Sequence, residues 1–107
     1  MVEVFNFNKE WEKSLGRAVK VIDMDEKIQA GILTMPPHTR LPEKGFSIHK
    51  EYHEFAYIIE GEVTLVTDSG EFTAKSGEFI YNEPNTPHYT VNREDKPAKV
   101  LWMLVRI

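Results

Sequence analysis

Apolar and polar residues alternate along most of this chain, and turn-forming residues interrupt the alternation at short intervals. A period of two is typical of β-strands, because successive side chains of a strand point to opposite faces of a sheet. The strands that this pattern predicts are Ala18–Met24, Lys27–Met35, Glu54–Glu60, Glu62–Thr67, Glu71–Lys75, Phe79–Asn82 and His88–Asn92. Many short strands separated by frequent turns indicate an all-β sandwich or barrel.

Three segments depart from simple alternation. Ala98–Ile107 is apolar at most positions, which predicts a strand buried on both faces. Residues 35–45 contain three prolines and are expected to form a loop or an irregular edge, because proline cannot donate to a central ladder. Near the start, one short helix is expected, with Asn8 as its cap, Trp11 and Leu15 on one face, and Gly16 at its end.

Length and charge limit the classes of function. A chain of 107 residues suits one domain over 1–107, with the barrel core at roughly 18–107. The net charge is −4 and the basic residues are scattered, which argues against nucleic acid or an acidic membrane as the partner. Cysteine is absent, so thiolate metal sites and disulfides are excluded.

The N-terminal segment and the composition bear on the cellular compartment and on the kind of source organism. The segment from Met1 to Lys13 carries acidic residues and no long apolar run, so no signal peptide is predicted and a cytoplasmic protein is expected. Lysine and glutamate are abundant, whereas glutamine occurs only once, at Gln29. This bias is typical of thermophilic proteins.

The histidines carry the candidate chemistry. His49, His53 and Glu54 cluster where a predicted strand begins, and His88 begins another strand. Two strands of a small barrel can direct imidazole and carboxylate groups at one interior point, where they suit a first-row transition metal. Alternatively, a buried Glu54 only pairs with a histidine or a lysine, since a buried carboxylate needs some partner. His38, in the proline-rich segment, is expected to be a solvated histidine.

Two spaced motifs resemble those of the cupin superfamily. In the first, six residues separate Glu54 from Gly61, and four residues separate His49 from Glu54, which places His49 as the second histidine of a His-x-His pair. The second runs from Gly77 through EFIYNEPNTP to His88 and, after three residues, to Asn92. The resemblance spans Ser47 to Asn92. It implies an all-β double-stranded β-helix, or jelly-roll barrel, with at most one short N-terminal helix.

The family pattern implies four metal ligands, of which His49, Glu54 and His88 are present. Ser47 occupies the position of the first histidine, and a serine hydroxyl is a poor ligand. His53 is a candidate replacement if residues 50–53 form a turn or a bulge, because neighbours on a regular strand point to opposite faces. Asn85 replaces the motif glycine and tolerates the same left-handed backbone.

The resemblance implies a divalent transition metal, with Fe, Mn, Ni and Zn all open, and several types of reaction. These are dioxygenase, decarboxylase, isomerase and lyase reactions on a small polar, carboxylate or sugar-like substrate. Glu83 and Tyr81 are candidate catalytic residues, and Arg40 and Lys44 could meet an anionic substrate. The alternatives are a non-catalytic module that binds a small ligand and a domain whose site is vestigial. A homodimer paired through edge strands is expected.

Overall fold

The fold is known from a computed structural model, which describes residues 1–107. It contains one 3₁₀ helix and nine strands. Their bounds are η1 Asn8–Ser14, β1 Ala18–Met24, β2 Ile28–Met35, β3 Thr39–Leu41, β4 Tyr52–Glu60, β5 Glu62–Thr67, β6 Gly70–Lys75, β7 Phe79–Asn82, β8 His88–Asn92 and β9 Ala98–Arg106. The helix η1, with 7 residues, is far too short to span a membrane.

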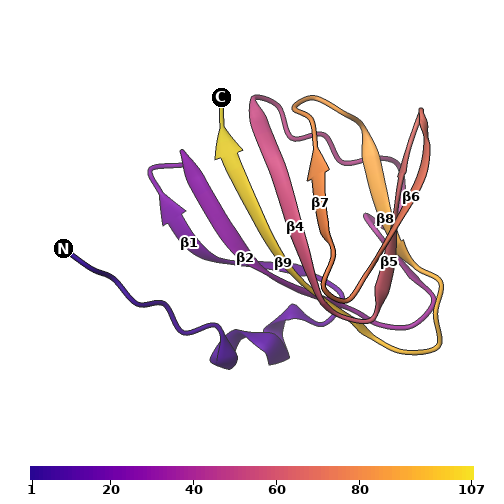
Figure 1. Ribbon diagram of the computed structural model, residues 1–107, viewed down its shortest axis with the longest axis horizontal. Helices are drawn as coiled ribbons and strands as arrows, with labels where there is room; N and C mark the ends of the chain where they lie inside the picture. Colours follow the sequence, from indigo (N-terminus) through magenta and orange to yellow (C-terminus); the bar gives the residue numbers. More distant parts are fainter.

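The strands form two antiparallel sheets. One has five strands in the order β1-β2-β9-β4-β7, and the other has four in the order β3-β8-β5-β6 (Figure 1). The expectation of an all-β jelly roll with one short N-terminal helix is confirmed. Consecutive strands such as β4 and β5 lie in different sheets, so the chain repeatedly crosses between the two layers.

The core lies between the two sheets. Its buried members come from β2, β4, β5, β6 and β9: Leu33, Met35, Ile58, Val63, Ala74, Ala98 and Val100. Alternation along β4 directs Glu54, Ala56 and Ile58 inward, as the sequence predicts, and places Phe55 and Tyr57 on the outer face. The sheets therefore enclose an apolar interior that a few polar side chains enter from one end.

The prediction that β9 is buried on both faces is only partly confirmed. It lies between β2 and β4, and its inward Val100 and Leu104 are buried. Its outward Leu101 and Met103 are half-buried, because the outer side of this sheet carries no second layer of strands. The edge expected within residues 35–45 is strand β3, which pairs with β8 at the border of its sheet.

The N-terminal helix forms, but its predicted cap is wrong. Phe7 occupies the cap position without a side-chain hydrogen bond, and Asn8 is already helical. The helix ends at Ser14, so Leu15 lies outside it and is exposed. The buried Ser14 hydroxyl lies 2.9 Å from the hydroxyl of Thr34, which fastens the helix to β2.

Candidate metal centre

Three of the predicted ligands converge at one end of the sandwich. Glu54 lies near the start of β4, His88 begins β8, and His49 precedes a turn at residues 50–51. In that turn Glu51 has a φ of 65°, a left-handed conformation that breaks the strand alternation. The turn allows His49 and Glu54, an odd number of residues apart, to face the same interior point.

The donor atoms are spaced as ligands of a single ion. Nε2 of His49 lies 3.2 Å from one carboxylate oxygen of Glu54, and Nε2 of His88 lies 3.2 Å from the other. The potential ligand atoms of all three residues lie within 4.8 Å of one another. Two atoms each about 2.0–2.2 Å from one ion lie about 3.0–3.5 Å apart. The donor set therefore fits a first-row divalent metal.

The polar surroundings of His88 orient its ring. Nδ1 of His88 lies 2.9 Å from the carbonyl oxygen of Thr86 and 3.0 Å from Nδ2 of Asn82. When Nδ1 donates its proton to that carbonyl, the lone pair of Nε2 faces Glu54, the tautomer that a metal requires. Asn82 Nδ2 donates a hydrogen bond to Oε1 of Glu54 at 3.3 Å. The sequence analysis missed Asn82, because its contact depends on the pairing of Asn82 with Glu54 across β7 and β4.

Charge and burial oppose each other at Glu54. Burial alone would raise the pKa of this carboxyl group. The hydrogen bond from His49, the charges of His88 and His49, and the bond from Asn82 outweigh burial and lower the pKa. The same hydrogen bond to Glu54 raises the pKa of His49, against a smaller effect of burial. Both shifts favour the same arrangement, a protonated His49 that donates to an ionised Glu54.

The triad borders a cavity of about 200 Å³ between the sheets. Eleven of the sixteen residues that line it are hydrophobic, so it is an apolar chamber with a polar end. Ser47 lines this polar end, and its backbone pairs with His88 through two hydrogen bonds of 2.8 and 3.0 Å. Ser47 thus stands beside His88 and leaves space where the family motif has a histidine.

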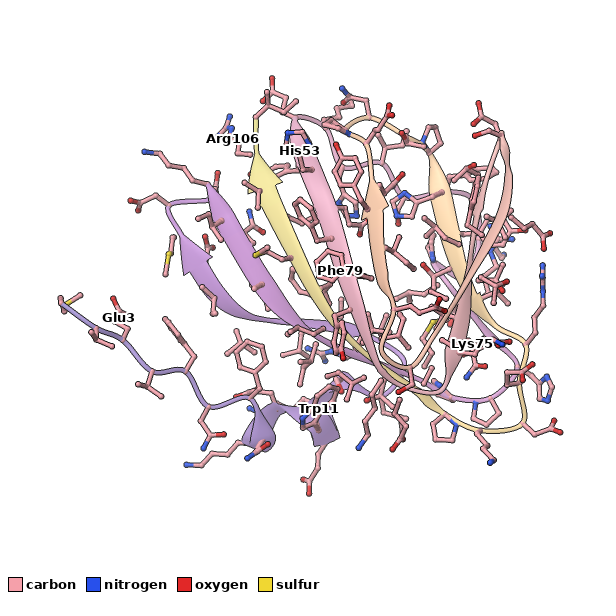
Figure 2. The ribbon with its side chains drawn as sticks, in the orientation of Figure 1. Glu3, Trp11, His53, Lys75, Phe79 and Arg106 are labelled. Carbon is pink, nitrogen blue, oxygen red and sulfur yellow. The ribbon has the colours of Figure 1, made fainter.

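His53 is not brought to the triad. Strand β4 begins at Tyr52, so His53 and Glu54 follow regular alternation and point to opposite faces. Nδ1 of His53 lies 2.7 Å from the hydroxyl of Tyr81. Figure 2 shows His53 beside Arg106, at the end where β9 finishes.

The other predicted positions lie apart from the cavity. Tyr81 and Glu83 line an open groove by β5, β6 and β7, so the structure does not place them with the triad. Their catalytic roles stay predictions. His38 is exposed, as expected, with Nε2 2.6 Å from a carboxylate oxygen of Asp95.

The remaining motif positions shape the backbone around the site. Asn85 adopts a φ of 64°, the conformation expected for a residue in place of glycine, and its amide donates to the carbonyl of His49 at 3.1 Å. Gly61 has a φ of 81°, and an added Cβ would lie 2.7 Å from the carbonyl oxygen of Pro97. Asn92 is fully buried and bonds only to backbone groups, so it fastens the loops rather than the metal site.

Comparison with known proteins finds one family for this chain. The family described as "Cupin domain" matches residues 31–104. An uncharacterised protein of Methanocaldococcus jannaschii is 39% identical over 56 residues, which cover 50% of this chain and 45% of that protein. The chain thus spans less than half the length of this curated relative.

Two solved structures illustrate the likeness. Protein TT1209 of Thermus thermophilus superposes with a TM-score of 0.78 at 18% identity, over 98% of each chain. A sugar phosphate isomerase of the cupin superfamily from Silicibacter pomeroyi gives a TM-score of 0.65 at 26% identity, over 76% of this chain and 52% of that one. The first of these supports the fold alone.

Proposed function

The chain belongs to the Cupin domain family, and on that premise we propose that it is a metal-dependent enzyme acting on a small molecule in the cavity between its sheets. The observation that carries this proposal is the convergence of His49, Glu54 and His88 on one point beside that cavity. Two imidazoles and one carboxylate suit Fe, Mn, Ni or Zn, and three protein ligands leave positions open for a substrate.

The reaction classes proposed are those of dioxygenases, decarboxylases, isomerases and lyases. A bound divalent metal would hold a substrate oxygen and stabilise the negative charge that develops on it. Glu54 supplies the compensating charge, and the Thr86 carbonyl keeps the His88 ring in its ligating orientation. Ser47 offers a hydroxyl at the polar end, where it can donate a hydrogen bond to the substrate oxygen.

The cupin resemblance implies small polar, carboxylate or sugar-like substrates, which share oxygen atoms able to bind a metal. One similar structure bears the name of a sugar phosphate isomerase, so an isomerase reaction is among the candidates. A second candidate function is a non-catalytic module that binds a small ligand. The largely apolar lining favours it, because such a chamber can hold an apolar molecule without help from a metal.

A thermal-shift screen of small molecules separates the two functions. Each compound is tested with metal-loaded protein, with chelator-treated protein, and with a metal-treated His88→Ala variant. Stabilisation that requires the metal and is lost in the variant supports the enzyme, and turnover of such a compound establishes it. Compounds that still stabilise the chelator-treated protein and are not converted to a product would instead support the binding module.

A further inference from the structure

The cavity beside the triad is polar at one end only. Its polar lining residues lie within segments 47–54 and 88–90. The rest of the lining includes Ile58, Val63 and Val100, which belong to the hydrophobic core. A ligand that reaches from the triad into the chamber therefore places its far end among apolar side chains.

No lysine or arginine lines this cavity. Arg40, which the sequence suggests for an anionic substrate, is engaged elsewhere. Its guanidinium lies 3.7 Å from the ring centroid of Tyr89 and donates to the carbonyl oxygens of Pro42 and Gly45. A phosphate or carboxylate in the apolar part would thus be buried without a counter-charge, which is strongly unfavourable.

The volume limits the size of the ligand. An apolar cavity of about 150 Å³ in another protein holds one benzene molecule, and the chamber here measures about 200 Å³. We infer that the ligand of this site is a small molecule with an uncharged, apolar body the size of a six-membered ring and an oxygen-bearing metal-binding group at one end. This inference rests on the proposed function, because the oxygen-bearing end needs the metal.

Three hydroxamates test the inference with Zn²⁺-loaded protein. Acetohydroxamate carries only the metal-binding group, benzohydroxamate adds a phenyl ring, and 4-carboxybenzohydroxamate adds a charge to that ring. Dissociation constants are measured by calorimetry against chelator-treated protein. The phenyl ring is expected to tighten binding at least about 30-fold, because burying it removes apolar surface from water. The added carboxylate is expected to cancel that gain.

The outcomes separate this inference from the proposed function. Absence of binding by all three compounds to metal-loaded protein contradicts the open metal position itself. Binding of acetohydroxamate with no gain from the phenyl ring, or tighter binding of the carboxylate compound, overturns only the inferred ligand class. An Ala56→Leu variant, which fills part of the cavity, is expected to weaken benzohydroxamate and to spare acetohydroxamate. If that variant does not fold, the affinities of the three compounds for the unaltered protein still test the inferred ligand class.

Discussion

Asn92→Ala tests whether the last residue of the second motif serves the fold rather than the metal. The side chain is fully buried. Its Nδ2 donates to the carbonyl oxygens of Lys96 at 2.8 Å, Met35 at 3.1 Å and Pro36 at 3.3 Å, and its Oδ1 accepts from the Glu94 amide at 2.9 Å. Two N–H groups and one acceptor are thus used, and the variant leaves their backbone partners unsatisfied.

The expected loss is about 3 kcal/mol in the free energy of unfolding, at about 1 kcal/mol for each of three hydrogen-bonding groups. For a chain of this length, that corresponds to a melting temperature lower by about 13 °C. Urea unfolding followed by circular dichroism measures the change directly. Metal affinity should remain within about twofold of wild type, because Asn92 does not contact the triad.

Asn8→Ala is the matched control. Asn8 is exposed, so its truncation should change stability by no more than about 0.5 kcal/mol. If Asn92→Ala cost no more than this control, the account of Asn92 as the residue that fastens the loops would be refuted. A large loss of metal affinity with little loss of stability would refute it equally.

Three further predictions concern the site and the sheet that carries it. The hydrogen bond to Glu54 raises the pKa of His49 above its ordinary value of 6.5, so a metal must displace the proton on the His49 ring when it binds. The affinity of the protein for the metal should therefore rise with pH, by up to about tenfold per pH unit, through a range that extends above 6.5, and then level off. An affinity that stays constant between about pH 6 and about pH 9, a range that begins just below the ordinary histidine pKa and extends well above it, would argue against His49 as a ligand. His53→Ala should leave the metal affinity within about twofold, since its ring faces the outer side of the sheet; a tenfold loss measured by calorimetry would make it a ligand after all. Gly31→Ala should lower the free energy of unfolding in urea by more than about 3 kcal/mol, because the added Cβ would lie 1.9 Å from the carbonyl oxygen of Val19. A loss below about 1 kcal/mol, as small as that of a mild substitution, would show that the backbone there can shift to make room.

Alternation alone was enough to predict most of the sheet structure. Strands β1, β5, β7 and β8 have the predicted bounds, because clear turn residues flank short runs of period two. The helix cap was less predictable. Asn8 is a residue type that favours caps, yet Phe7 takes that position, and the backbone amide of Asn8 donates to Oδ1 of Asn6 at 2.9 Å.

The candidate site was predictable where it depends on sequence spacing. His49, Glu54 and His88 occupy motif positions, and the structure brings them together. Contacts that depend on strand register could not be read from the sequence. Asn82 reaches Glu54 only because β7 pairs with β4 in one particular register. The engagement of Arg40 with Tyr89 likewise depends on how the proline-rich segment folds back over β8.

Calorimetric titration of chelator-treated protein with Zn²⁺ is the most direct test of the claim that His49, Glu54 and His88 form a metal centre. One ion per chain is expected. His49→Ala and His88→Ala should each weaken binding at least about 100-fold. His38→Ala, which removes an exposed histidine paired with Asp95, should bind as tightly as wild type. Binding well below one ion per chain, or affinities in the His49 and His88 variants equal to that of His38→Ala, would contradict the metal centre.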